Sequence, residues 1–355
     1  MQKDVEVSEI TDIKDIDSAE LAKNENAKFS FGGATLYGIN AVIGSGIFLL
    51  PRTIYQDLGP ASLVAMVLDA VLVLMLAVCF AEVAGYFNKN GGAFQYSKTA
   101  FGDFIGFNVG VLGWFVTIIA WAAMAAGFAK LLIQTFPALE GQNTLISICL
   151  VIFLSVINSM GIKTSKIFTI VITIAKLIPI IAFTLIAVFF IENGINQGNF
   201  TPFLQLNPDM TLSKAMASTS LTVFYAFIGF EALPVVAGEM RNAKKNVPKA
   251  IIGSISIVSL LYFMIIAGTI AMLGTGILQS NAPVQDAFVE MIGPAGKWII
   301  SIGALISIAG LNMGDSLMIP RYGASIADEG LLPKVIAKKN NKNAPIGAVI
   351  FAGLL

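Results

Sequence analysis

The segment Ile43-Gly44-Ser45-Gly46-Ile47-Phe48 lies inside the first long apolar run of the chain and decides the fold. In a helix interior each of its two glycines costs about 1 kcal/mol relative to alanine. A broken backbone in a bilayer also leaves N–H and C=O groups without water, so it is tolerated only where it lines a cavity inside the protein. Two interpretations follow: a helix interrupted at an anion-binding site, or a continuous helix whose glycines permit close packing.

The composition is that of a membrane protein, because hydrophobic residues make up 56% of the 355 residues and charged residues only 12%. A hydrocarbon core about 30 Å thick requires about 20 apolar residues per helix. Apolar runs of that length predict a series of spans, with a further span that begins near Ala344 and is cut off at Leu355. The complete spans are expected at residues 31–55, 60–87, 104–136, 143–162, 164–191, 211–239, 248–274 and 298–320.

The charged residues predict the orientation of these spans. Residues 1–28 are polar and acidic, and we expect them to form a disordered cytoplasmic tail without a secretory signal. With the N-terminus inside, most of the 22 Lys and Arg residues fall on the cytoplasmic side, as the positive-inside rule requires. We therefore predict a multi-pass protein of the cell membrane, in contact with the lipid bilayer, whose N-terminus is cytoplasmic.

The residue types argue against an enzyme. The chain has no histidine, and its two cysteines, Cys79 and Cys149, lie in apolar runs. No acidic or cysteine cluster has the spacing of metal ligands, and no phosphate-binding loop or nucleophile–base pair is present. We predict no catalytic residue, no metal site, no cofactor and no nucleic-acid partner.

A second interrupted helix is predicted in the sixth span. Phe227-Ile228-Gly229-Phe230-Glu231 places a glycine and an acid in mid-span, and Pro234 follows. Two broken helices, each the first of a set of five, are typical of an inverted-repeat transporter. This pairing favours a real interruption at Gly44 over close packing. Glu231 has two open roles: it could bond the frayed backbone of its own helix, or it could titrate during transport.

Two further charges lie deep in predicted spans. Lys176, in the fifth span, is too far from either end to reach water. It is either part of a structural ion pair or a proton carrier, because burial lowers the pKa of a lysine. Asp69, in the second span, is expected to face the protein interior, and the sequence names no partner for it.

Motifs along the chain then become recognisable as a set. They are Gly44-Ser45-Gly46-Ile47-Phe48, Glu82 with Gly91-Gly92-Ala93-Phe94-Gln95-Tyr96 and Phe101-Gly102, the loop from Gly238-Glu239 to Pro248-Lys249-Ala250, and the stretch from Pro320-Arg321-Tyr322 to Pro333. Together they resemble the amino acid–polyamine–organocation (APC) superfamily of transporters. The chain departs from the pattern at Ala243, where proline is usual, and at Glu329, where aspartate is common.

The resemblance implies an all-α membrane protein with a LeuT-like five-plus-five inverted-repeat helical bundle. Residues 29–191 would form the first repeat. Residues 192–355 would form the second, incomplete repeat, because the chain is truncated in its ninth span. No oligomeric state is implied.

The resemblance also implies a substrate pocket between the two broken helices. Freed N–H groups of Ser45, Gly46 and Ile47 would bind an α-carboxylate, and backbone carbonyls near Ala41, Phe227 and Ile228 would bind the α-ammonium. Phe230 and Tyr225 are candidate lids. The predicted substrate site comprises Ala41, Ile43, Gly44, Ser45, Gly46, Ile47, Tyr225, Phe227, Ile228, Gly229, Phe230 and Asp315, and the predicted proton-coupling residues are Lys176 and Glu231.

Lys176 matches the position at which some proton-coupled members place a lysine, where sodium-coupled relatives hold a metal ion. Asp315 matches a position that faces the pocket in arginine/agmatine antiporters, although their pocket asparagine in the third span is replaced by Trp121. A carboxylate there favours a cationic substrate side chain, unless Asp315 instead neutralises Lys176.

The sequence therefore predicts a secondary active transporter of amino acids, coupled to protons by symport or exchange, with a preference for cationic amino acids. Two alternatives stay open. One is an amino-acid sensor or transport-inactive fragment that keeps the pocket. The other, within transport, is an exchanger of neutral amino acids or polyamines.

Overall fold

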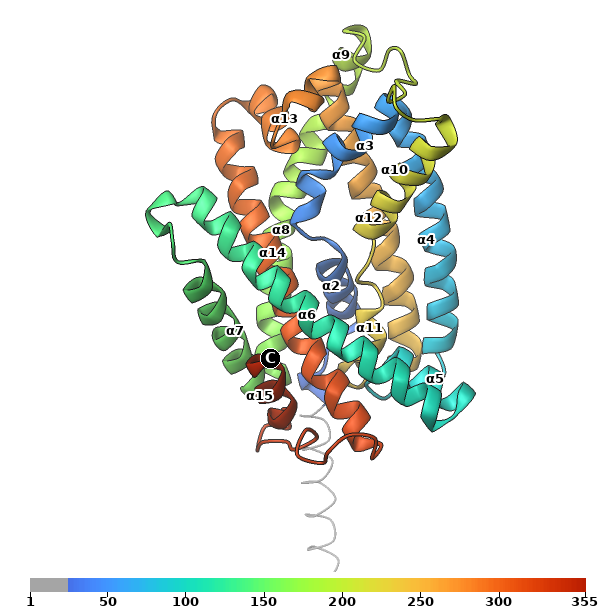
Figure 1. Cartoon of the computed structure of the whole chain (residues 1–355), viewed down its shortest axis with the longest axis vertical. Coiled ribbons are helices and arrows are strands. Elements are labelled where there is room, and N and C mark those ends of the chain that lie inside the picture. The colour runs from blue at the N-terminus through green and yellow to red at the C-terminus, as the bar shows by residue number, and fades with distance from the viewer. Residues whose placement is uncertain (1–24) are drawn as a thin grey trace, which may run out of the picture.

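A computed structural model describes residues 25–355, and this part of the chain consists of helices and loops (Figure 1). In chain order the helices are α2 Phe31–Val42, η1 Ser45–Phe48, α3 Leu50–Leu58, η2 Gly59–Ala61, α4 Ser62–Ala84, α5 Ala93–Phe101, α6 Asp103–Thr135, η3 Pro137–Leu139, α7 Asn143–Ser159, α8 Ile162–Val188, α9 Ile191–Asn196, α10 Leu212–Ala226, α11 Ala232–Val235, η4 Ala237–Glu239, α12 Ala243–Leu273, η5 Gly274–Gln279, α13 Pro283–Ile292, α14 Ala295–Asp328 and α15 Ile346–Leu354.

Both predicted interruptions are present. The first apolar run is divided into α2 and α3, with Ile43 and Gly44 outside any helix and one turn of 3₁₀ helix, η1, between them. The sixth run is divided into α10 and α11, separated by residues 227–231. In Figure 1 the α2–α3 pair occupies the middle of the bundle, and α6, α8, α12 and α14 surround it.

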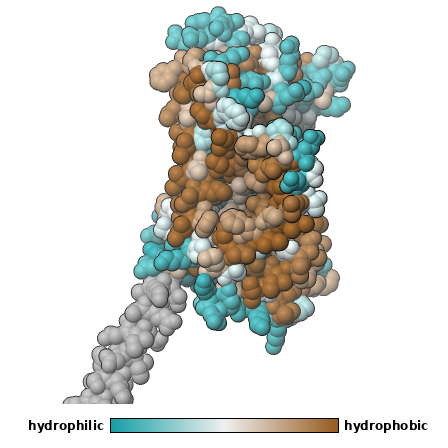
Figure 2. Space-filling model, turned by 90° about the vertical axis from the view of Figure 1, so that its left-hand side faces the viewer, coloured by the Kyte–Doolittle hydropathy of each residue, from teal (hydrophilic) through white to brown (hydrophobic). Residues whose placement is uncertain are grey.

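The long helices carry the hydrophobicity expected of membrane spans. Five described segments are long and apolar enough to cross a membrane: Leu50–Ala84, Asp103–Thr135, Ile162–Asn196, Ala243–Gln279 and Ala295–Asp328. The remaining predicted spans are the two broken ones and α7, which is apolar but shorter. Figure 2 shows the resulting surface, with a hydrophobic band over the middle and hydrophilic residues at both ends.

Two helix boundaries differ from those predicted from the sequence. The last long helix, α14, continues beyond Pro320 to Asp328, and α12 begins at Ala243, ahead of Pro248. Proline removes one backbone donor and favours a helix end. Here nearly every residue from Ser316 to Ala327 is buried, so tertiary packing holds the helix through the proline.

The start of the described chain is fastened to the bundle. Phe29 is fully buried, and its N–H and C=O bond to the Glu239 carbonyl and the Arg241 N–H, both at 2.9 Å. The Arg241 side chain also donates to the Glu25 and Asn26 carbonyls, and Lys166 of α8 donates to those of Asn26 and Lys28. Residues 25–28 of the predicted tail thus contact the bundle, and the rest of that tail, residues 1–24, lies outside the described residues.

Candidate functional site

The first break exposes backbone groups that no side chain caps. Ile43 has extended dihedral angles (φ −75°, ψ 109°), and Gly44 precedes η1 without a side-chain cap. Gly44 approaches α14 so closely that a Cβ atom would lie 2.8 Å from Leu311 Cδ1, whereas Gly46 is exposed and a Cβ there would meet nothing within 4 Å. The N–H groups at the start of η1 therefore border open space beside α14.

The two breaks lie against each other. Gly229 has a φ of 128°, and a Cβ atom on it would lie 2.1 Å from the carbonyl oxygen of Ala41, at the end of α2. Tyr262 of α12 links the last residue of α2 to the last residue of α10. Its hydroxyl lies 3.2 Å from the Val42 carbonyl and 3.1 Å from the Ala226 carbonyl. The backbone of Gly229 thus packs directly on the last turn of α2. Sequence reasoning missed Tyr262, since it looked like one more apolar residue of a long span.

Glu231 contacts the backbone of its own broken helix. The Gly229 N–H donates to Glu231 Oε2 at 2.9 Å. This contact corresponds to the first of the two roles considered for Glu231, that of a capping group. It also orients Gly229 against α2.

Lys176 reaches the first break from α8. Its side chain is fully buried, and its ammonium donates to the carbonyls of Asn40 at 2.9 Å and Ile43 at 2.6 Å. The Ser307 hydroxyl of α14 donates to the same Ile43 carbonyl at 3.4 Å. Among residues 25–355 no carboxylate lies within 4.0 Å of the Lys176 nitrogen. The partners of this lysine are therefore carbonyl oxygens of the frayed end of α2, and Asp315 forms no direct ion pair with it.

Asp315 of α14 and Trp121 of α6 lie at the same level of the bundle. Trp114 of α6 donates to the Ile319 carbonyl at 2.9 Å, and Asn312 of α14 donates to the Met124 carbonyl at 3.3 Å. These two contacts set an antiparallel register that brings Trp121 and Asp315 to the same level. Asp315 Oδ2, the Trp121 indole N–H and Asn312 Oδ1 are buried and have no hydrogen-bond partner. Two acceptors and one donor of α14 and α6 are thus left without partners at this level.

The aromatic residues near the second break differ in exposure. Phe230 is 7% exposed and meets Phe80 of α4 edge-on, with ring centroids 5.3 Å apart. Phe227 is buried against Tyr262. Tyr225 is 75% exposed and Ile228 48% exposed. Of the two predicted lids, Phe230 is packed into the bundle and Tyr225 lies on its surface.

Comparisons with known proteins agree with this geometry. A family model described as amino acid permease matches residues 29–355. The chain belongs to the amino acid permease family. The relatives are transporters rather than enzymes.

Relatives with curated descriptions include two bacterial proteins and one plant protein. An uncharacterised transporter of Mycobacterium tuberculosis is 31% identical over 344 residues, which covers 90% of this chain and 70% of the relative. A serine/threonine exchanger of Bacillus subtilis is 31% identical, and the match covers 83% of this chain and 67% of the relative. A chloroplastic cationic amino acid transporter of Arabidopsis thaliana is 26% identical, and the match covers 85% of this chain and 55% of the relative.

Solved structures share the fold. A nucleobase-cation-symport-1 family transporter, solved in a closed conformation with bromovinylhydantoin bound, has a TM-score of 0.63 at 13% identity and covers 93% of this chain and 72% of its own. A Na⁺-coupled sialic acid symporter in a substrate-bound outward-open state has a TM-score of 0.62 at 14% identity, with the same coverage. The LeuT-like architecture expected from the sequence is confirmed, and the apolar helices fit a multi-pass membrane protein.

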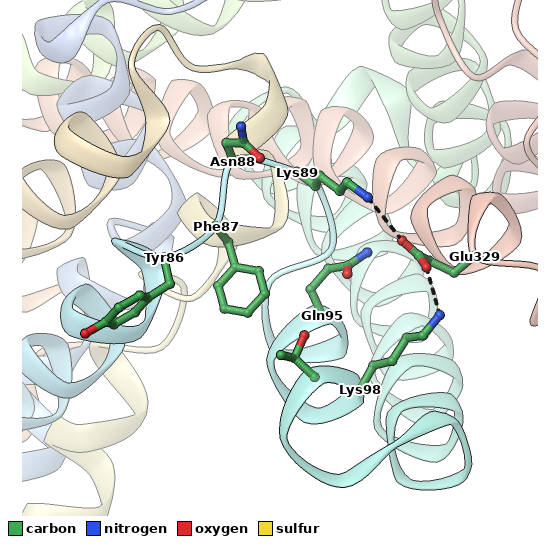
Figure 3. A pocket seen from close by; sticks show the side chains of 8 residues that line it. Tyr86, Phe87, Asn88, Lys89, Gln95, Lys98 and Glu329 are labelled. Atoms are coloured by element: carbon green, nitrogen blue, oxygen red, sulfur yellow. Dashed lines mark hydrogen bonds and ion pairs between the residues drawn. The ribbon is translucent and has the colours of Figure 1, made fainter.

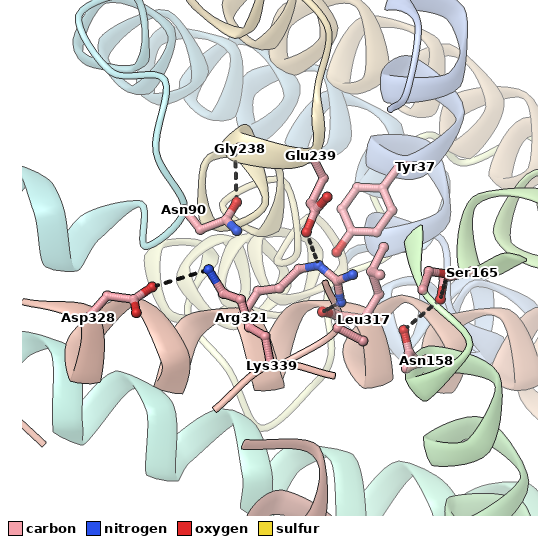
Figure 4. Close-up of polar contacts among 12 residues, drawn as sticks. Tyr37, Asn90, Asn158, Ser165, Gly238, Glu239, Leu317, Arg321, Asp328 and Lys339 are labelled. Atoms are coloured by element: carbon pink, nitrogen blue, oxygen red, sulfur yellow. Dashed lines mark hydrogen bonds and ion pairs between the residues drawn. The ribbon is translucent and has the colours of Figure 1, made fainter. Parts of the chain in front are cut away.

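Motif residues of the permease meet at one end of the bundle (Figure 4). Arg321 of α14 is 2% exposed; its Nε lies 2.5 Å from Glu239 Oε1, and it also donates to the Leu317 carbonyl. The Gly238 N–H donates to Asn90 Oδ1 at 2.8 Å. The motif after the second broken helix is thus joined to α14 and to the loop before α5.

A surface pocket lies beside this junction, lined by residues of the α4–α5 loop, α5 and the end of α14 (Figure 3). Glu329 lies 2.8 Å from the Lys98 ammonium and 3.6 Å from that of Lys89. The hydrogen bond from Lys98 lowers the pKa of Glu329, and the same contact raises the pKa of Lys98. The Glu329 carboxylate is neutralised by the ammonium groups of Lys98 and Lys89, so we interpret these charges as a structural contact between α5, the α4–α5 loop and the end of α14.

Proposed function

We propose that this permease is a proton-coupled carrier of amino acids in which Lys176 carries the coupling proton. The supporting observation is the pair of hydrogen bonds from the buried Lys176 ammonium to the Asn40 and Ile43 carbonyls. In a low-dielectric interior an ammonium without a carboxylate partner is costly, so these carbonyl contacts matter for holding it charged. A protonated lysine supplies one positive charge to the first break, and deprotonation removes that charge.

Proton release from Lys176 would change the first break directly. Since Ile43 separates α2 from η1, loss of the ammonium contact frees the hinge between the two halves of the helix. Asn40 keeps its own bond to the Gly310 carbonyl at 2.7 Å, so α2 stays attached to α14 while the hinge moves. Protonation is thereby linked to the position of the half-helix that borders the substrate pocket. Glu231 would act beside it as a cap of the second break.

The substrate would be a zwitterion held by backbone groups. The N–H groups of Ser45, Gly46 and Ile47 would receive the α-carboxylate, since they are uncapped and carry the positive end of the half-helix. The carbonyls of Ala41, Phe227 and Ile228 would receive the α-ammonium. Both contacts are independent of the side chain, which leaves substrate choice to α6 and α14.

Asp315 and Trp121 would set that choice. An unpartnered carboxylate oxygen favours a substrate side chain with a positive charge, and the unpartnered indole N–H of Trp121 would be free to donate to the substrate. We therefore propose a preference for cationic amino acids. A relative in Arabidopsis is named a cationic amino acid transporter, whereas one in Bacillus is named a serine/threonine exchanger, so a neutral substrate is the second candidate.

The proposal includes a cell-membrane location with a cytoplasmic N-terminus and the two repeats at 29–191 and 192–355. With that orientation the Arg321–Glu239 contact lies on the cytoplasmic side. The permease would then be closed to the cytoplasm by the motif residues of Figure 4.

Uptake into proteoliposomes tests the role of Lys176. We expect a proton gradient to drive accumulation of a radiolabelled amino acid without sodium, and Lys176→Ala to lose gradient-driven accumulation by tenfold or more while still binding substrate. A matched control is Lys130→Ala, because Lys130 is an exposed lysine of α6. A strict sodium requirement, or full accumulation by Lys176→Ala, would refute the coupling. Accumulation only into preloaded vesicles would indicate exchange, and binding without any accumulation would indicate a sensor.

A competition panel tests the role of Asp315. Lysine, arginine and ornithine should inhibit uptake more strongly than serine, threonine or leucine. Asp315→Asn should weaken inhibition by the cationic amino acids by about tenfold or more, which corresponds to loss of one buried charged contact, and should leave neutral competitors nearly unchanged. If neutral amino acids are the better competitors of the wild-type protein, the cationic preference is wrong.

A further inference from the structure

A buried carboxyl outside the substrate site lies between α4 and α10. Asp69 is 4% exposed, whereas Leu68, Val71 and Leu72 on the same helix are about half exposed, as expected of lipid-facing residues. Asp69 Oδ2 is buried and has no hydrogen-bond partner. The acid thus faces the neighbouring helices rather than the lipid-facing side of α4.

The partner helix at this level is the outer half of the second broken helix. Ala65 of α4 and Ala215 of α10 lie in one apolar cluster, and Phe80 meets Phe230 further along. These contacts give the two helices a parallel register in which Asp69 is level with the segment 219–220. The hydroxyl of Ser220 lies beside the Asp69 carboxyl.

Two further hydroxyl groups of α4 and α10 lack hydrogen-bond partners. Thr219 Oγ1 and Ser62 Oγ are buried without hydrogen-bond partners. In a helix a threonine hydroxyl commonly bonds to the carbonyl one turn earlier, so an unpaired one is unusual. Polar groups therefore line both sides of the α4–α10 contact without forming a closed network.

No positive charge compensates Asp69. The basic residue of α10 is Lys214, in its first turn. The basic residues of α12 lie near the far end of α4 from Asp69, where Gly85 approaches the Lys244 backbone; they are Lys244, Lys245 and Lys249. The charged residues of α3 are Arg52, which donates to Ser280 and Asn281, and Asp57. Within residues 25–355 Asp69 takes part in no ion pair. Ionised, it would be a lone buried charge; protonated, it would add a donor to an interface that offers free acceptors.

We propose that Asp69 is a second proton-binding site, separate from Lys176, whose protonated carboxyl holds α10 against α4. Proton loss leaves a carboxylate that only water can stabilise, so α10 moves away from α4 and admits water. Since α10 is the outer half of the second broken helix, the protonation state of Asp69 controls whether the substrate pocket is open to the outer side of the membrane. The biological role of this site rests on the proposed transport function. Proton binding at Asp69, by contrast, does not depend on Lys176.

The experiment measures the position of α10 without substrate or transport. Spin labels replace Ser213, at the exposed start of α10, and Lys297, at the exposed start of α14, after Cys79 and Cys149 have been changed to alanine. Pulsed electron spin resonance then gives the distance distribution in lipid nanodiscs across a range of pH. We expect the wild-type background to move between two distributions, with the longer distance gaining weight as pH rises.

Three variants decide the outcome. Asp69→Asn, which imitates the protonated acid in size, should keep the short distribution at every pH. Asp209→Asn, which removes an exposed acid just before α10, should behave as the wild type. Ser220→Ala should shift the midpoint by about one pH unit while leaving both end distributions unchanged. A wild-type pH response in Asp69→Asn, or no pH response in the wild type, would overturn the proposal.

A Lys176→Ala background separates this inference from the proposed function. If α10 still responds to pH there, Asp69 acts independently of the coupling lysine. Loss of the response in Lys176→Ala together with its persistence in Asp69→Asn would assign the whole effect to Lys176 and would contradict the second site.

Discussion

At the scale of the residue, Gly229 determines how closely the two breaks approach. Its φ of 128° is a region that residues with a Cβ rarely adopt, and such a Cβ would also overlap the Ala41 carbonyl. The sequence predicted a glycine break here, because the residue interrupts an apolar span. It could not predict the contact with Ala41, since that depends on how two distant segments are packed.

Gly229→Ala is therefore expected to destabilise the permease. Backbone strain of this kind costs about 1–3 kcal/mol, and displacement of α2 adds to it. Thermal unfolding in detergent, followed by the loss of the monodisperse elution peak, should show a clear fall in the midpoint. Gly32→Ala is the control, because a Cβ there meets nothing within 4 Å. Equal midpoints for the two variants would mean that the breaks do not need this contact.

Lys176 and Asp315 illustrate what residue patterns can and cannot predict. A lysine in mid-span indicated a special role, and its carbonyl partners follow from the break at Ile43. The direct ion pair with Asp315, considered as an alternative, is absent, because no carboxylate of residues 25–355 lies within 4.0 Å of the Lys176 nitrogen. The distance between these two side chains depends on how α8 and α14 pack, which no local motif encodes.

At the scale of the element, the long helices were the most predictable part of the structure. Apolar length alone located α4, α6, α8, α12 and α14 to within a few residues at most ends. The ends of α12 and α14 were harder, because Pro248 and Pro320 suggest boundaries that burial overrides. The contacts of residues 25–28 with Arg241 and Lys166 are tertiary and could not be predicted from the sequence either.

The contact between α5 and the end of α14 should depend on pH. Lys98 holds the pKa of Glu329 below its ordinary value, so this contact stabilises the fold above about pH 4.3 and is lost as pH falls through the lower folded-state value. Glu329→Gln should reduce the free energy of unfolding at pH 7 by about 0.2–1 kcal/mol and leave it unchanged near pH 3.

The measurement is the unfolding midpoint of Glu329→Gln at the two pH values. Glu140→Gln is the control, because Glu140 is an exposed acid that forms no ion pair among the described residues. A Glu329→Gln effect that is equal at both pH values would show that charge is irrelevant to this contact.

At the scale of the whole molecule, the permease combines a bundle of long helices with two interrupted helices at its centre. α8 and α14 contact the first break through Lys176 and Ser307, while α12 contacts both breaks through Tyr262. Motion at either break is therefore transmitted to helices on several sides. This arrangement fits alternating access, in which half-helices move against a scaffold.

We propose that backbone groups at the first break bind the carboxylate of an amino acid. The most direct test uses Ser45→Cys in a protein whose Cys79 and Cys149 are alanine, and follows its reaction with a small maleimide. We expect the transported amino acid to slow labelling several-fold, whereas the corresponding amine without a carboxylate should not. Labelling that the amino acid leaves unchanged, or that the amine slows equally, would show that the first break does not bind the carboxylate.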